Sequence, residues 1–252
     1  MRVPGFILRE LLDQANLTPV EKTLYLMTAE YHPRSVLDLA KRAGISGKLA
    51  TKACRNLAGL GWMALVESRQ KIRPVALIPQ VCQEKMVQVL EAGYDLAGNK
   101  GEFLMKRCLD LWVHSDEFMD NARPAFLISP TTGERLEYDR YYLQAVAFEF
   151  NGAQHYEVTE VYGDEKALGE AKARDYIKDS LSGRNGVTLV TVTSEDLDPG
   201  AFRKVIPQNL LLNQVFTEGC YFTALTRMCG AYRAKAARPT RSIQQTRAGT
   251  GK

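Results

Sequence analysis

The chain has 252 residues, enough for one large domain or for two of ordinary size. Hydrophobic residues make up 45% of it and charged residues 25%, a composition typical of a soluble globular protein. The net charge of +4 indicates no particular partner by itself. Two blocks, however, carry basic residues and no acidic ones: Leu39 to Val66, and everything after Glu218. Such blocks favour local contact with a polyanion.

Cysteine usage and apolar runs indicate where the protein works. The five cysteines are scattered without a CxxC pair, which fits free thiols in a reducing compartment better than disulfides or a zinc site. The N-terminus does not read as a signal peptide, and no apolar run approaches the roughly 20 residues that span a bilayer. We therefore expect a cytoplasmic protein without membrane contact.

The first 79 residues predict helices followed by a ribbon. Thr18 reads as an N-cap with Pro19 behind it, Ser35 and Ser46 read as two further caps, and Gly44 ends the middle helix. Two β-prone runs, 62–68 and 75–79, follow on either side of a charged turn at 69–73.

This order resembles a winged helix-turn-helix domain, and the segment A-K-R-A-G-I-S at 40–46 carries the resemblance. In that family a recognition helix enters the major groove and the wing contacts the DNA backbone or minor groove. The resemblance implies two sets of DNA-binding residues, Lys48, Thr51, Lys52 and Arg55 on the helix and Arg69, Lys71 and Arg73 on the wing. The alternatives are a helical bundle with a solvated basic face and a protein-docking module.

Residues 80–98 predict a connecting helix and a linker, and the pattern changes after them. Residues 99–230 predict a helix at 101–113, strands at 126–129, 135–143 and 145–150, a helix at 165–186 and a strand at 187–193. This order is typical of an α/β or α+β domain with a central mixed sheet flanked by helices. Residues 209–228 form a further helix candidate, and the basic segment 231–252 is expected to be a disordered tail.

Two acidic residues of the predicted sheet form the main candidate site. A hairpin centred on Gln144 would place Asp139 directly opposite Glu149, with Cβ atoms about 5 Å apart. Facing carboxylates repel each other and do not both stay ionised without a cation between them. A hard divalent ion such as Mg²⁺ is the usual cation at such a pair.

Asp139, the run E-F-N-G-A-Q-H at 149–155 and the pair Arg174-Asp175 together resemble the PD-(D/E)XK nuclease superfamily, in particular its very-short-patch-repair-endonuclease-like branch. The resemblance covers about residues 100–197 and implies a restriction-endonuclease-like domain that hydrolyses DNA phosphodiesters. Asp139, Glu149 and the carbonyl of Phe150 would hold Mg²⁺ or Mn²⁺. Glu102, on the first helix of the domain, would reach a second ion or a metal-bound water.

Asn151 departs from the family pattern, because the superfamily has a catalytic Lys at this place and the related branch prefers Asp. Three residues are candidates for the missing role: Gln154, His155 as a general acid or base, and Lys178 reaching over from the following helix. Loss of activity is the other alternative.

The sequence thus predicts a metal-dependent DNA endonuclease that a winged helix targets to duplex or branched DNA, with a second copy of the chain as a further partner. Such combinations are common in mobile-element and DNA-processing proteins. Two alternatives stay open: a non-enzymatic DNA-binding regulator built on a decayed nuclease domain, and a protein-interaction adaptor.

Overall fold

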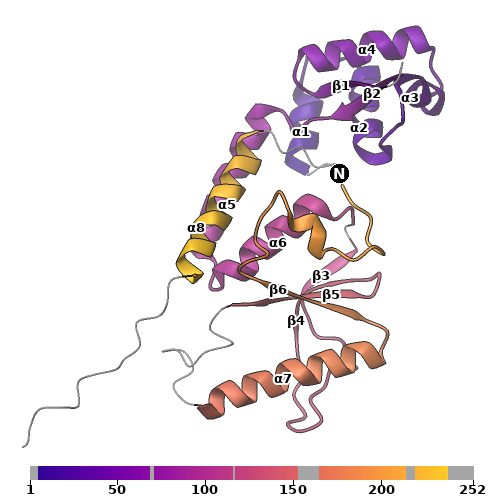
Figure 1. The fold of residues 1–252 in the computed structure, drawn as a ribbon. Coiled ribbons are helices and arrows are strands. Elements are labelled where there is room, and N and C mark those ends of the chain that lie inside the picture. The colour runs from indigo at the N-terminus through magenta and orange to yellow at the C-terminus, as the bar shows by residue number, and fades with distance from the viewer. Residues whose placement is uncertain (1–4, 69–70, 116, 153–164, 214–218, 238–252) are drawn as a thin grey trace, which may run out of the picture.

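The computed structural model describes residues 5–68, 71–115, 117–152, 165–213 and 219–237 (Figure 1). These residues form a mixed α+β structure with a two-stranded antiparallel sheet near the N-terminus and a four-stranded mixed sheet in the second half. No helix of the described part is long and apolar enough to cross a membrane.

The N-terminal part consists of helices that pack on a small β-ribbon. The helices are α1 (Gly5–Asp13), α2 (Pro19–Tyr31), α3 (Val36–Ala43) and α4 (Gly47–Gly59), and the ribbon is β1 (Met63–Ser68) paired antiparallel with β2 (Lys71–Ala76). Thr18, Ser35 and Ser46 each accept a hydrogen bond from a backbone N–H in the first turn of the helix that follows, as predicted. The charged run at 69–73 is not all turn, because β2 already begins at Lys71.

Beyond the ribbon, α5 (Gln80–Leu96) leads into α6 (Lys100–Trp112) and the larger sheet. Its strands lie in the order β3 (Phe118–Ala122), β4 (Tyr138–Tyr142), β5 (Val146–Asn151) and β6 (Thr188–Thr193). The first three strands are antiparallel, whereas β6 runs parallel to β5 after the crossover helix α7 (Glu165–Arg184). The predicted mixed sheet, with one helix, three strands, a helix and a strand in succession, is confirmed, but the first strand is not the predicted one.

Helices cover both faces of this sheet. Figure 1 shows α7 on one side and α6 on the other, with α8 (Cys220–Ala236) lying along α5. The larger core cluster joins α6 and α8 to β5 through Leu104, Phe148 and Phe150, and a smaller one joins α7 to Tyr138 and Ala147. A 3-10 helix (Phe202–Val205) packs on the α6 side.

Three segments differ from the sequence predictions. The β-prone run at 126–129 makes only an isolated bridge from Ile128 to Arg135, and the first strand is instead β3, the edge of the sheet. Within 209–228, α8 starts only at Cys220. The basic tail prediction for 231–252 is wrong up to Ala236, because α8 continues there and packs Tyr232 against Phe150; residues 238–252 lie outside the described part.

Candidate functional site

The hairpin of β4 and β5 has the predicted register. Arg140 pairs with Phe148 and Tyr142 with Val146, so the next position along brings Asp139 beside Glu149. The tight connection needs no glycine because Ala145 adopts a left-handed conformation, with φ of 57°, and its carbonyl accepts the Thr188 N–H from β6.

Asp139 departs from regular pairing in a way that the sequence does not predict. Neither the β3–β4 register nor the β4–β5 register includes it, although both neighbouring pairs on the β3 side, Asp120–Arg140 and Ala122–Tyr138, are present. Instead, the Phe150 N–H donates to Asp139 Oδ2 at 2.7 Å. Irregular strand pairing of this kind re-aims a side chain, and it is common beside functional sites.

Burial controls the ionisation of the Asp139 carboxyl. Burial raises its pKa to about 6, the Phe150 N–H acts in the opposite direction, and the charge of Glu102 raises it further. As the pH falls below neutral, this carboxyl therefore takes up a proton earlier than an ordinary aspartate does, and a nearby positive charge would oppose that uptake.

Glu149 is paired with a lysine from α7. Lys178 Nζ lies 2.8 Å from Glu149 Oε1, and both side chains are 17% exposed. Burial raises the pKa of Glu149 to about 7, Lys178 lowers it and the nearby Asp139 raises it. The hydroxyls of Ser182 and Tyr138 are hydrogen-bonded, which fixes α7 against β4 and so fixes Lys178 over the hairpin.

Asn151 and Asp175 lie together at the end of β5. Asn151 Nδ2 donates to Asp175 Oδ2 at a long 3.5 Å, while the Arg174 side chain is exposed. An amide carries no positive charge, so Lys178 is the one predicted substitute for the missing lysine that the structure describes beside Glu149. The other two candidates, Gln154 and His155, lie outside the described residues.

Glu102 reaches the site because α6 begins directly against β5. A Cβ atom added at Gly101 would lie 2.0 Å from Phe150 Cε1, so only glycine permits this approach. Asn99 caps the helix by accepting the Glu102 N–H at 3.2 Å. Glu102 Oε1 accepts a hydrogen bond from Lys106 one turn later, at 2.6 Å.

Asp139 and Glu149 are the candidate ligands for a hard divalent cation. Among the described residues no group of three or more His, Cys, Asp or Glu side chains is arranged to hold a metal. Mg²⁺, however, commonly uses one or two protein carboxylates together with water and substrate phosphates. Asp139 and Glu149 are two such carboxyls: both are partly buried, and the charge of Asp139 raises the pKa of Glu149.

Two charged residues at the site were missed by the sequence analysis, Arg140 and Lys106. The Arg140 side chain is 1% exposed; it forms ion pairs with Asp110 at 2.6 Å and Asp120 at 2.7 Å and lies over the Phe118 ring. Arg140 stands at an inward position between Tyr138 and Tyr142, and that alternation was the available signal. For Lys106 the signal was its place one helical turn after Glu102.

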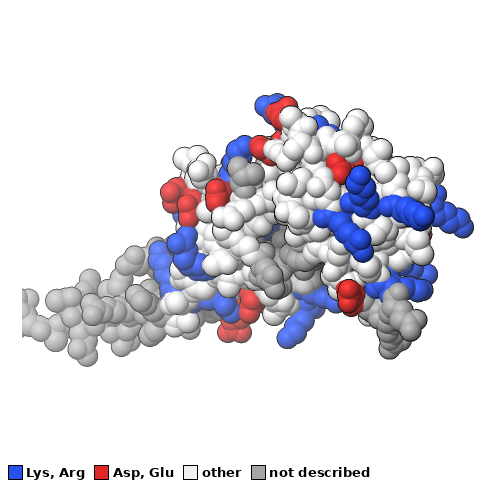
Figure 2. All heavy atoms as spheres, turned by 90° about the horizontal axis from the view of Figure 1, so that it is seen from above, with Lys and Arg blue, Asp and Glu red and all other residues white. Residues whose placement is uncertain are grey.

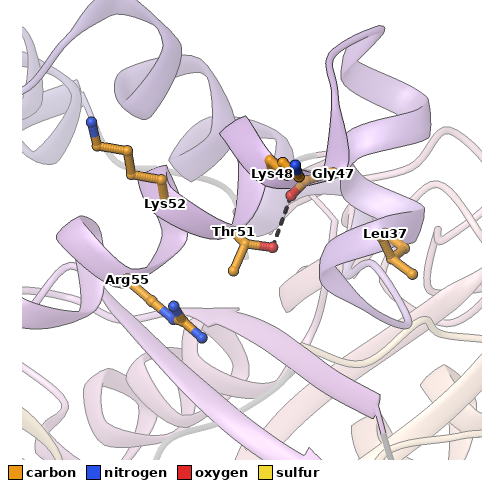
Figure 3. Close-up of a pocket in the computed structure, with 6 residues that line it drawn as sticks. All are labelled: Leu37, Gly47, Lys48, Thr51, Lys52 and Arg55. Carbon is orange, nitrogen blue, oxygen red and sulfur yellow. Dashed lines mark hydrogen bonds between the residues drawn. The ribbon is translucent and has the colours of Figure 1, made fainter.

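The basic residues of α4 surround a second candidate site, an open hollow of about 690 Å³. Lys48, Lys52 and Arg55 are exposed, and Thr51 Oγ1 donates to the Gly47 carbonyl at 2.8 Å (Figure 3). Leu37 of α3 completes the lining. Lys and Arg side chains gather over this end of the molecule (Figure 2). Lys71 and Arg73 are exposed on β2, and Arg69 lies outside the described residues.

Comparisons with known proteins give little further guidance. No family model and no solved structure matches the chain. A segment of 90 residues is 33% identical to the uncharacterized protein 033L of invertebrate iridescent virus 3; it makes up 33% of this chain and 46% of that protein. The match therefore spans less than half of the viral relative.

Proposed function

We propose that the chain is a metal-dependent DNA endonuclease, in which a winged-helix-like N-terminal part binds DNA and the site around Asp139 and Glu149 hydrolyses the phosphodiester. One observation carries the proposal. Two partly buried carboxyls with raised pKa values, those of Asp139 and Glu149, lie on adjacent strands, and Lys178 of α7 forms an ion pair with Glu149. Taking carboxylates out of water costs free energy, so a fold keeps two of them together mainly where they are used.

The chain's own residues have distinct roles in this proposal. Asp139 and Glu149, with the Phe150 carbonyl, hold Mg²⁺ or Mn²⁺, and the Phe150 N–H keeps the Asp139 carboxylate oriented. The bound ion supplies an activated water and stabilises the charge that develops on the phosphate. Lys178 takes the place of the lysine absent at 151: its ammonium donates to Glu149 Oε1 and would stabilise the negative charge that builds up on the phosphate.

DNA binding rests on the charge of the α4 hollow. Lys48, Lys52 and Arg55 are exposed around one concave surface, and no acidic residue lies between Leu39 and Val66 to oppose them. Contacts of this kind to phosphates release counterions, so the affinity falls steeply as salt rises. Lys71 and Arg73 of the ribbon would extend the same surface.

The test is cleavage of plasmid and branched DNA with Mg²⁺, with Mn²⁺ and with a chelator. We expect metal-dependent nicking or cutting that Asp139→Asn and Glu149→Gln reduce by on the order of 100-fold or more. Glu134→Gln, an exposed carboxylate in a loop, is the matched control and should cleave like the wild type. Cleavage that survives both site substitutions contradicts the proposal.

A second candidate function is that of a DNA-binding regulator with an inactive nuclease domain. Asn151 at the lysine position favours it, as does the ion pair by which Lys178 already occupies Glu149 Oε1. Duplex binding without metal-dependent cleavage of any substrate would support this function. A chain that shows no affinity for duplex DNA at low salt would instead favour the adaptor alternative.

A further inference from the structure

Lys106 is the least exposed lysine of the candidate active site. Only 9% of the residue is exposed, and a buried ammonium is costly unless several acceptors compensate it. Its Nζ donates to Glu102 Oε1 at 2.6 Å and to Asn121 Oδ1 at 2.8 Å, with Asp120 Oδ1 at 3.9 Å. Acceptors from both α6 and β3 therefore fix the ammonium in one place.

The position of Asn121 connects this lysine to Asp139. The β3–β4 pairs on either side, Asp120–Arg140 and Ala122–Tyr138, put Asn121 opposite Asp139 across the sheet. Asn121 has a φ of 54°, a left-handed conformation that asparagine tolerates better than most residues. The charge of Glu102 raises the pKa of Asp139 and the charge of Lys106 lowers it, so both side chains lie close enough to act on Asp139 electrostatically.

We propose that Lys106 is a positioning residue: anchored by Asn121, it holds Glu102 beside Asp139 and limits the negative charge of the site. The inference rests on the proposed function, because it takes Asp139 and Glu149 as the metal-binding pair. It extends the site by one strand, to β3, and gives Glu102 a fixed place rather than a mobile one.

This role predicts opposite changes in metal affinity and turnover. Without the Lys106 charge, Glu102 and Asp139 attract a cation more strongly, so Mn²⁺ binds more tightly. Glu102 is at the same time no longer held, so kcat falls. A lysine that served only the stability of the fold would, when lost, weaken both metal binding and turnover together.

The experiment uses the full chain and the variants Lys106→Met, Lys106→Arg and Asn121→Gly. Glycine accepts the positive φ of position 121, so this variant removes the acceptor of Lys106 while keeping the backbone. Lys204→Met, in the 3-10 helix, removes an exposed charge and is the control. Mn²⁺ affinity is measured from the electron paramagnetic resonance signal of free Mn²⁺, and kcat and KM from plasmid cleavage.

We expect Lys106→Met to bind Mn²⁺ about threefold to tenfold more tightly and to lose about tenfold or more in kcat with little change in KM. Lys106→Arg should restore much of the kcat, and Asn121→Gly should shift both quantities the same way by less. Unchanged or weaker Mn²⁺ binding by Lys106→Met overturns the role of Lys106. If the wild type binds Mn²⁺ but does not cleave DNA, only the proposed hydrolysis is refuted, and the affinity shift still decides the role of Lys106. If the wild type binds no Mn²⁺, both the proposed function and the role of Lys106 are overturned.

Discussion

Glu149 offers the most direct test of the electrostatics of the site, because its carboxyl is both buried and paired with Lys178. Burial raises the pKa of this carboxyl from its ordinary value of 4.5 to about 7, even though Lys178 opposes the rise. One pKa unit corresponds to about 1.4 kcal/mol, so holding ionised Glu149 in the folded chain above pH 7 costs roughly 3 kcal/mol.

The sign of the pH dependence follows from this pKa. The folded chain binds a proton at Glu149 more tightly than the unfolded chain does. The stabilisation of the folded chain by this proton is therefore fully present below pH 4.5. It is lost as the pH rises through about 7. The variant Glu149→Gln is neutral at every pH and keeps an amide oxygen that accepts a hydrogen bond from Lys178.

We therefore expect Glu149→Gln to be more stable than the wild type by about 1 to 3 kcal/mol at pH 8, with the difference shrinking as the pH falls toward 5. The lower figure allows for the weaker hydrogen bond between Lys178 and a neutral amide. Under the proposed function, the substitution would lower activity and raise stability together, as expected where a functional site is strained.

Urea denaturation of both proteins from pH 5 to pH 8, in the presence of a chelator, measures the free energies of unfolding. Glu134→Gln serves again as the control and should show the pH dependence of the wild type. A stability difference that does not change with pH would refute the reasoning, and so would a Glu149→Gln variant that is less stable than the wild type at pH 8.

Three further predictions follow from the same geometry. Mn²⁺ should raise the Tm of the wild type more at pH 8 than at pH 5, because protons compete with the ion for Asp139, whose pKa is about 6. Asp139→Asn should abolish this rise in Tm, and equal rises at both pH values would contradict the prediction. Gly101→Ala should cost about 1 to 3 kcal/mol of stability by urea denaturation, since its Cβ atom would lie 2.0 Å from Phe150, and a neutral effect would mean that α6 does not press on β5 as described. The double variant Lys52→Ala, Arg55→Ala should weaken duplex binding in fluorescence anisotropy and reduce the slope of log affinity against log salt by about 2, whereas an unchanged slope would show that DNA does not contact α4.

Much of the fold could be predicted because its signals are local. The caps Thr18, Ser35 and Ser46 mark helix starts by contacts within one turn, and the apolar run at 145–150 is unambiguous as a strand. β3 was missed because an edge strand with the sequence FMDNA has three exposed residues and no clear alternation. The run at 126–129 has higher β propensity, but Leu127 is buried in the smaller core cluster without strand pairing.

The site was predictable only in part, for a related reason. The register that brings Asp139 near Glu149 depends on one hairpin, so spacing along the chain was sufficient for this pair. Lys178 lies one crossover away and was a candidate only through the resemblance to the nuclease superfamily. The partners of Arg140 come from α6 and β3, and those of Lys106 include Asn121, 15 residues further along the chain. Contacts between separate elements leave no periodic trace in a single sequence.

Arg140 explains how a site that costs stability can keep its geometry. Its guanidinium joins Asp110 of α6 to Asp120 of β3, and it stands next to Asp139 on β4. The guanidinium is buried although both carboxylates are partly exposed, so losing these partners is costly, because it leaves a buried charge uncompensated. The ion pairs of Arg140 therefore hold together α6, β3 and β4, the three elements that carry Glu102, Asn121 and Asp139. Because burial raises the pKa values of Asp139 and Glu149, ionising them costs stability, and the ion pairs of Arg140 at the neighbouring position help to keep these strands in place.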